Sequence, residues 1–247
     1  MEVLAVIMAR AGSVGVPGKS RRELLGRPVI AYTFDQVRAA QRINRCVVSS
    51  DDQMILELAR SAGFALIERP PELATSPSAT DPVLRHAVRT MAERHRYAPE
   101  AVVMLYGNVP LRRHQMIDKC IAMLEETGAD SVQTIAPVGK NHPYWMFDLT
   151  PDANGDSVGT GGKITKHIPN QIFRRQDLPP LYAPTGAVYV MKTQVLMAGE
   201  GQADPHAFLG RDRRGLITAV EDSVDIDVPR DFFLAEAILR SEQTPLP

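Results

Sequence analysis

The sequence of 247 residues lacks the features that mark disulfide-rich, metal-scaffolded, membrane-spanning or nucleic-acid-binding proteins. Its only cysteines, Cys46 and Cys120, have no Cys-x-x-Cys or Cys/His spacing, which excludes a zinc site and predicts two buried free thiols. No apolar run is long enough to cross a bilayer, and no basic segment precedes the first run. We therefore expect a cytoplasmic protein without a signal peptide or a membrane partner.

An excess of charge of one sign is also missing. Lys and Arg total 28 against 29 Asp and Glu, so we expect no nucleic-acid partner. Hydrophobic residues make up 44% and charged residues 23%, which is typical of a soluble globular protein.

Short apolar runs alternate with segments of helical periodicity. We expect strands at residues 3–8, 45–50, 64–67, 101–105, 131–136, 186–191 and 216–220, and helices at 28–40, 52–62, 79–95, 113–126 and 229–240. This alternation predicts a three-layer αβα, Rossmann-like α/β fold with a mostly parallel sheet. In such sheets, ligands bind at the carboxyl ends of the strands.

The alternation stops between residues 138 and 182. This stretch is rich in Gly, Pro, Asn and His and has no long periodic segment, yet it is too long for an ordinary loop. We expect one domain over residues 1–247 with an inserted arm at 138–182. Aromatic residues of the arm, such as Trp145 and Phe173, suggest an apolar surface used to form a homodimer.

The loop after the first strand has the strongest functional pattern. Gly12, Gly15 and Gly18 leave its backbone free to turn N–H groups toward an anion, and Arg10 and Lys19 flank it with positive charge. A Walker loop needs four residues between its first glycine and Gly-Lys-Ser, whereas five are present here. The dinucleotide spacing Gly-x-Gly-x-x-Gly is absent from the loop as well. The loop is therefore suited to a polyphosphate but belongs to neither of these two types.

A pair of carboxylates stands near the C-terminus, in Ser223-Val-Asp-Ile-Asp227. In an extended segment the side chains of Asp225 and Asp227 point to the same side. Mg²⁺ prefers such oxygen ligands and shares its shell with substrate phosphates. Alternatively, the two aspartates cap the helix that begins near Pro229.

Several motifs, in order along nearly the whole chain, resemble the N-acylneuraminate cytidylyltransferase (CMP-sialic acid synthetase) family and its relatives that activate other acidic sugars. They are residues 5–20, 25–33, 47–52, 69–74, 110–112, 174–180, 186–189 and 223–227. The resemblance implies the nucleotidyltransferase fold of that family, with CTP and an acidic 2-keto sugar as substrates.

The resemblance also assigns the nucleotide side of the site. It implies that Arg10 and Lys19 are catalytic and bind the triphosphate, with Lys19 stabilising charge at the α-phosphorus. The implied nucleotide contacts also include the backbone of Ala11, Gly12 and Ser13, and the side chains of Arg69 and Thr80. Mg²⁺, or Mn²⁺, is implied on Asp225 and Asp227. The sugar hydroxyl would attack the α-phosphorus and release pyrophosphate; no residue stands out as the general base.

The acceptor side departs from the family pattern. Tyr106 stands where the family has a Gln that contacts the sugar, and Thr185 stands where Asn is common. The resemblance implies that these two residues, with Asn108, Arg175 and Gln176, bind the sugar acid. Two alternatives stay open: a nucleotidyltransferase for a neutral sugar phosphate or cofactor precursor, and a non-catalytic nucleotide-binding homologue.

Overall fold

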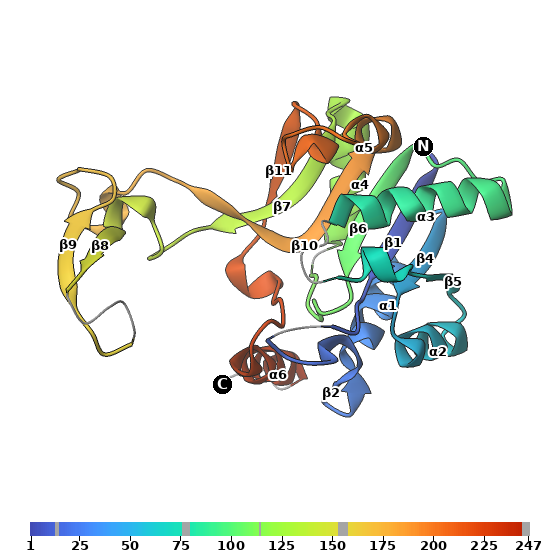
Figure 1. Ribbon diagram of the computed structural model, residues 1–247, viewed down its shortest axis with the longest axis horizontal. Helices are drawn as coiled ribbons and strands as arrows, with labels where there is room; N and C mark the ends of the chain where they lie inside the picture. Colours follow the sequence, from blue (N-terminus) through green and yellow to red (C-terminus); the bar gives the residue numbers. More distant parts are fainter. Residues whose placement is uncertain (13–14, 76–79, 114, 153–157, 244–247) are drawn as a thin grey trace. The chain divides into compact units, whose positions relative to one another are not determined.

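The computed structural model describes residues 1–12, 15–75, 80–113, 115–152 and 158–243 (Figure 1). The chain forms two compact units, one of residues 1–135 with 184–247 and the other of residues 136–183. No helix in the described ranges has the length and apolarity needed to span a membrane.

A seven-stranded sheet in the order β11-β7-β10-β6-β1-β4-β5 forms the centre of the first unit. The strands are β1 (Val3–Met8), β4 (Arg45–Ser50), β5 (Ala65–Glu68), β6 (Ala101–Tyr106), β7 (Ser131–Pro137), β10 (Tyr182–Lys192) and β11 (Arg213–Ile217). β1 pairs in parallel with β4 and β6, β4 with β5, and β11 with β7, whereas β10 runs antiparallel to β6. The predicted mostly parallel sheet is confirmed.

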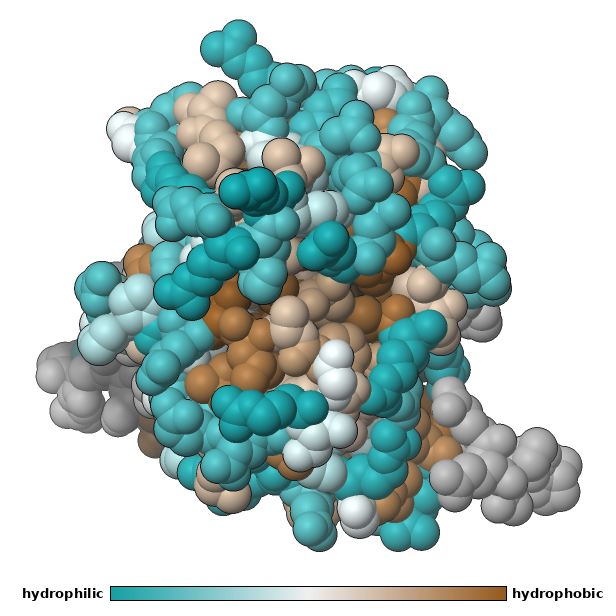
Figure 2. Space-filling view, turned by 90° about the vertical axis from the view of Figure 1, so that its right-hand side faces the viewer, coloured by the Kyte–Doolittle hydropathy of each residue, from teal (hydrophilic) through white to brown (hydrophobic). Residues whose placement is uncertain are grey.

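Helices cover both faces of this sheet. They are α1 (Val29–Ala39), α2 (Gln53–Ser61), α3 (Thr80–His95), α4 (Met116–Thr127) and α5 (Thr193–Ala198), whereas α6 (Pro229–Gln243) packs in a separate cluster with Leu24, Leu111 and Ile226. Side chains of β1 alternate between two cores, because Ile7 packs with residues of α1, α2 and α4, whereas Val6 packs with residues of α3 and α5. The three-layer αβα prediction is therefore confirmed. From the side of α2 and α3, apolar residues gather across the middle of the face (Figure 2).

Some predicted boundaries were wrong. The last strand, β11, is Arg213–Ile217 rather than 216–220, and a 3-10 helix (Val220–Asp222) follows it. α4 begins at Met116 rather than at residue 113, because Gln115 before it has a left-handed backbone (φ 56°) that a helix cannot include. The sequence did not predict α5 or the short hairpin of β2 (Glu23–Leu24) and β3 (Arg27–Pro28).

The second unit contains an antiparallel hairpin of β8 (Phe147–Pro151) and β9 (Gly162–Lys166), which sequence periodicity did not indicate. Its loops are held by side-chain hydrogen bonds: Trp145 Nε1 donates to the Ile172 carbonyl (3.2 Å) and Asn170 Nδ2 to the Tyr144 carbonyl (2.7 Å). All five residues of β8 are exposed, and so is Phe173. The use of this unit as a dimerisation arm stays a prediction.

Candidate functional site

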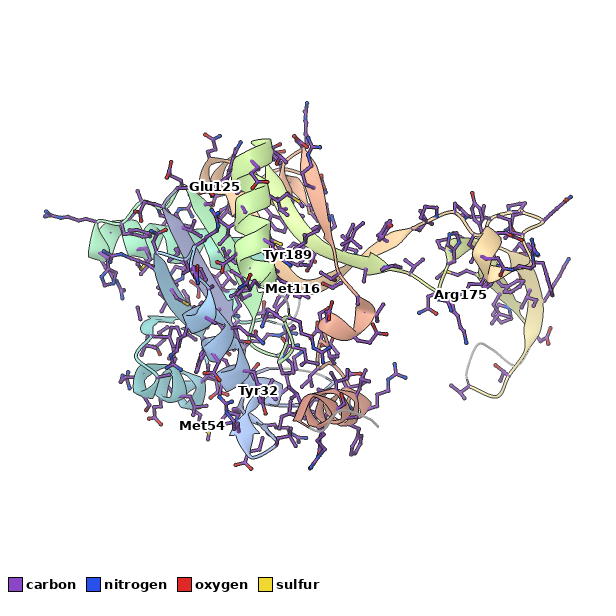
Figure 3. The ribbon with its side chains drawn as sticks, turned by 180° about the vertical axis from the view of Figure 1, so that it is seen from behind. Tyr32, Met54, Met116, Glu125, Arg175 and Tyr189 are labelled. Atoms are coloured by element: carbon purple, nitrogen blue, oxygen red, sulfur yellow. The ribbon has the colours of Figure 1, made fainter. Side chains whose placement is uncertain are left out.

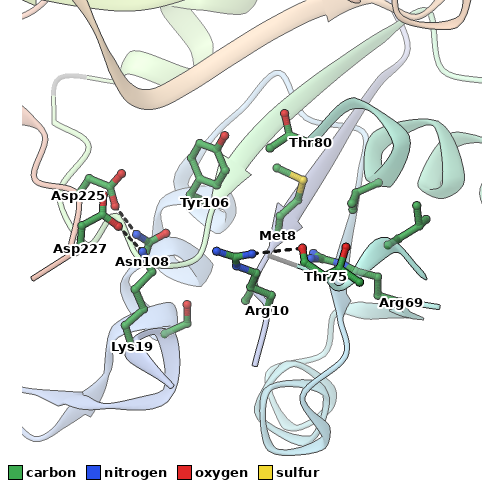
Figure 4. Close-up of a pocket in the computed structure, with 14 residues that line it drawn as sticks. Met8, Arg10, Lys19, Arg69, Thr75, Thr80, Tyr106, Asn108, Asp225 and Asp227 are labelled. Carbon is green, nitrogen blue, oxygen red and sulfur yellow. Dashed lines mark hydrogen bonds and ion pairs between the residues drawn. The ribbon is translucent and has the colours of Figure 1, made fainter. Parts of the chain in front are cut away.

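A pocket of about 240 Å³ opens in the first unit beside the carboxyl ends of β1 and β6 (Figure 4). It brings together eight residues that the sequence predicted to be functional: Arg10, Lys19, Arg69, Thr80, Tyr106, Asn108, Asp225 and Asp227. These residues come from positions as far apart as 10 and 227, so the fold assembles the site from the whole length of the first unit.

The glycine-rich loop lies against the segment that carries the two aspartates. A Cβ atom on Gly15 would collide with the main-chain carbonyl oxygen of Asp227, so only glycine fits at this approach. Gly18 has a left-handed backbone (φ 63°), and its turn leads into the 3-10 helix that starts at Lys19. The Ala11 N–H donates to Asp51 Oδ1 (2.9 Å), the space around Gly12 is open, and Ser13 lies outside the described residues.

Lys19 and Asn108 each contact one of the two carboxylates. Lys19 Nζ lies 2.5 Å from Asp227 Oδ1. Asn108 Nδ2 donates to Asp225 Oδ1 and to the Ile226 carbonyl (3.1 Å), and the Ile226 N–H donates back to the Asn108 carbonyl (3.0 Å). These hydrogen bonds join the loop after β6 to the segment of residues 223–227, which we call the aspartate segment, and both carboxylates line the pocket.

Burial, together with the nearby charge of Asp227, raises the pKa of Asp225 to about 6, although Lys19 and Arg112 oppose the shift. Asp231, in the first turn of α6, accepts with Oδ2 the N–H groups of Asp227 and Val228 (both 2.8 Å), which fixes the backbone that carries Asp227. Among the described residues, no cluster of three or more His, Cys, Asp or Glu side chains could hold a metal. Two carboxylates nevertheless fit Mg²⁺, which commonly takes one or two of them and completes its shell with phosphates and water.

Arg10 and Arg69 form the opposite wall. Arg69 is buried and donates from Nη2 to the Ser49 carbonyl (2.9 Å), and its burial lowers its pKa. Arg10 Nη1 donates to the Thr75 carbonyl (3.4 Å). These contacts place two guanidinium groups beside the pocket, which favours an anionic ligand.

Tyr106, the last residue of β6, lies at the back of the pocket. Burial raises its pKa to about 12, Tyr189 adds to the shift, and a hydrogen bond with Thr80 opposes it. Thr80 is the first residue of α3. The phenol is therefore a neutral hydrogen-bonding group at physiological pH.

Three of the residues predicted to bind the acceptor do not line this pocket. Arg175 and Gln176 belong to the second unit, where both are exposed in a 3-10 helix (Arg175–Asp177; Figure 3). Thr185 Oγ1 lies 2.7 Å from Thr134 Oγ1, between β10 and β7. The roles of these three residues stay predictions.

The sequence did not single out Arg112, which organises the back of the site. Arg112 is only 8% exposed, and its guanidinium donates to the carbonyls of Tyr106 (2.6 Å), Val109 (2.7 Å) and Ala187 (2.6 Å). Burial lowers its pKa to about 9. In the sequence it appeared only within the 110–112 motif of the family resemblance, which assigned it no role.

A protein-family model described as cytidylyltransferase matches residues 4–194. Over 251 residues, the chain is 27% identical to the CMP-N,N'-diacetyllegionaminic acid synthase of Legionella pneumophila, and the match covers 100% of both chains. It is 26% identical over 235 residues to an N-acylneuraminate cytidylyltransferase of Streptococcus agalactiae. That match covers 94% of this chain and 52% of the relative.

Among solved structures, the CMP:2-keto-3-deoxy-manno-octonic acid synthetase, determined in complex with CTP, matches with a TM-score of 0.70. The match covers 98% of this chain and 100% of that chain at 17% identity, so it shows a shared fold.

Proposed function

The chain belongs to the cytidylyltransferase family, and we propose that it transfers CMP from CTP to the anomeric hydroxyl of an acidic 2-keto sugar. The observation that carries this proposal is the convergence of Arg10, Lys19, Asp225 and Asp227 on one pocket. The basic pair suits a triphosphate, and the acidic pair suits the cation that accompanies it. The names of the relatives support an acid as the acceptor.

Asp225 and Asp227 would hold Mg²⁺, with Mn²⁺ as an alternative, which would neutralise phosphate charge and help to align the triphosphate. Lys19 would stabilise the charge that develops at the α-phosphoryl group as pyrophosphate leaves. Its ammonium group already lies in the pocket, held by Asp227. Arg10 and the backbone of Gly12 and Ser13 would bind the remaining phosphates, and the Ala11 N–H would join them by exchanging its bond to Asp51 Oδ1 for one to phosphate.

Arg69 and Thr80 would recognise the cytosine. A guanidinium can donate to the carbonyl oxygen of the base, and a hydroxyl can serve either hydrogen-bonding role. The Ser49 contacts that fix Arg69 leave it oriented before the nucleotide arrives.

On the acceptor side, Tyr106, Asn108 and Thr185 would contact the sugar acid from the first unit. Arg175 and Gln176 of the second unit would bind its carboxylate in a homodimer, because a guanidinium pairs with a carboxylate through two parallel hydrogen bonds.

Thermal unfolding with Mg²⁺ and each of CTP, UTP, ATP and GTP tests the nucleotide assignment. A ligand that binds only the folded protein raises the melting temperature, so we expect a rise with CTP alone. An equal response to all four nucleotides would contradict the cytidine assignment and favour a nucleotidyltransferase of different specificity.

Pyrophosphate release then tests turnover. We expect release with CTP and at least one of N-acetylneuraminate, N,N'-diacetyllegionaminate and 3-deoxy-manno-octulosonate. Binding of CTP without release on any acid would instead support a non-catalytic homologue or a neutral acceptor.

A further inference from the structure

A second pocket of about 680 Å³, which we call the α3 pocket, lies in the first unit and is lined by α3 and by the segment 67–75. It shares Arg69 and Thr75 with the first pocket, so one guanidinium lines both spaces (Figure 4). Its volume is typical of pockets that hold a small organic molecule. Its side chains on α3 have no part in the proposed transfer of CMP.

Three polar side chains of α3 line this pocket: His86, Thr90 and Arg94. They are spaced four residues apart, and residues at this spacing lie on the same face of a helix. Nδ1 of His86 is buried and has no hydrogen-bond partner among the described residues. A buried polar atom without a partner costs free energy, which a bond to a ligand would recover. His86 is therefore the residue whose surroundings most favour a bound ligand.

The end of the α3 pocket at His86 favours an anion. Burial lowers the pKa of His86, and the charge of Arg94 is the next largest cause. Arg69 acts in the same direction, whereas Glu72 and Glu93 oppose the shift. The guanidinium of Arg94 thus lies near the imidazole, and it forms no ion pair with a carboxylate of the described residues. A guanidinium and an imidazole together suit the oxygens of a phosphate group.

The other end of the α3 pocket has two carboxylates, Asp51 and Glu68. Neither is among the described charges that shift the pKa of His86, so both lie farther from the imidazole. One oxygen of each already accepts a hydrogen bond, Asp51 Oδ1 from the Ala11 N–H (2.9 Å) and Glu68 Oε1 from Gln53 Nε2 (3.0 Å). The second oxygen of each carboxylate can accept a hydrogen bond from a hydroxyl group.

Arg69 connects the α3 pocket with the first pocket. Its Nε and Nη2 donate to Oγ (3.4 Å) and the carbonyl oxygen (2.9 Å) of Ser49. Its Nη1 has no hydrogen bond to any described residue. A ligand in either pocket can therefore compete for the same guanidinium.

We propose that the α3 pocket binds a sugar phosphate and that this ligand weakens the binding of CTP. The three polar side chains of α3 bind the phosphate, the two carboxylates accept hydrogen bonds from the hydroxyl groups, and Pro70 and Pro71 contact the carbon skeleton. The phosphate attracts Arg69 away from cytosine, and CTP weakens the sugar phosphate in return. The effect on CTP rests on the proposed function, whereas the binding of the sugar phosphate does not.

Calorimetric titration of the protein without CTP tests the site. The probes are glucose 6-phosphate, glucosamine 6-phosphate and ribose 5-phosphate, with glucose and inorganic phosphate as the two separate parts of such a ligand. We expect at least one sugar phosphate to bind more tightly than inorganic phosphate, and glucose not to bind. Equal affinity for inorganic phosphate, or no binding of any sugar phosphate, would overturn the proposal.

The decisive variants are Arg94→Gln and His86→Leu, each of which should weaken the sugar phosphate about tenfold, as for a lost hydrogen bond. Their matched controls are Arg60→Gln and His95→Gln, because both residues are exposed and line neither pocket. Arg94 is itself exposed, so its variant keeps the test valid if His86→Leu does not fold. Equal affinity in Arg94→Gln and Arg60→Gln would place the ligand outside the α3 pocket.

Steady-state kinetics then tests the effect on CTP. A saturating sugar phosphate should raise the KM for CTP at least about fivefold in the wild type and leave it unchanged at the same concentration in Arg94→Gln. An equal rise in both would show competition in the first pocket and overturn the proposal. If no acid releases pyrophosphate, the proposed function fails, and calorimetric titration of CTP with and without the sugar phosphate decides the coupling by the same criterion.

Discussion

Lys19 Nζ lies 2.5 Å from Asp227 Oδ1, so the cation that the phosphate loop contributes is paired with a carboxylate predicted to bind Mg²⁺. The two residues are 208 positions apart in the chain. The side chain of Asp227 is 66% exposed, and such exposed pairs add little to stability. The pair is better understood as holding Lys19 in the pocket than as stabilising the fold.

Replacing Lys19 by Met should therefore reduce kcat far more than it reduces stability. We expect a loss of about 10²–10³-fold in kcat, as for the removal of one group that stabilises developing charge. Steady-state kinetics checks this, with Lys119→Met, an exposed lysine on α4, as the control for the loss of a positive charge. A drop of only a few fold would place Lys19 outside the catalytic machinery.

Asp225→Asn should stabilise the ligand-free protein above about pH 6. The folded-state pKa of Asp225, about 6, exceeds the ordinary value of 3.8, so ionisation of the folded protein costs free energy. The free energy of unfolding of the wild type therefore falls progressively as the pH rises from about 4 to above 6, by up to about 3 kcal/mol. Asn keeps an oxygen for Asn108 without the charge.

Chemical denaturation at about pH 4 and about pH 8 tests this sign. The variant should gain stability over the wild type only at the higher pH, while pyrophosphate release is lost with the carboxylate. A gain of equal size at both pH values would show that the effect is not electrostatic.

Gly15→Ala should disrupt the site through a backbone clash. The added Cβ would meet the carbonyl oxygen of Asp227, so either the phosphate loop or the aspartate segment must move. We expect the CTP-induced rise in melting temperature to disappear. Gly12→Ala is the matched steric control, because no atom lies within 4 Å of the position that its Cβ would take, and it should leave the melting temperature of the ligand-free protein unchanged.

Arg112→Met should destabilise the fold and loosen the loop that carries Asn108. The change leaves the buried carbonyls of Tyr106, Val109 and Ala187 without their donor. We expect a loss of about 2–4 kcal/mol in the free energy of unfolding. The exposed Arg60→Met on α2 should change it by less than about 0.5 kcal/mol. Similar changes in the free energy of unfolding for the two variants would show that the hydrogen bonds of Arg112 to the three carbonyls do not stabilise the fold.

The sequence alone was sufficient for the fold class, and eight of the residues it singled out line one pocket. Apolar runs such as residues 3–8 predict buried parallel strands because both faces of such a sheet are covered. The spacing of Gly12, Gly15 and Gly18 between Arg10 and Lys19 predicts an anion loop because those constraints are local. The boundaries of α4 and β11 were less predictable, because a left-handed residue at Gln115 and the pairing of β11 with β7 override local pattern.

Tertiary structure decided how distant residues meet. Asn108 contacts Asp225 across 117 positions, and Arg112 reaches Ala187 across 75, neither of which periodicity can indicate. The sequence determined most of the local elements and the charged side chains from which phosphate and metal binding is predicted. Only the packing of the sheet determined which of these groups are desolvated and brought within contact, because burial and distance are properties of the folded chain.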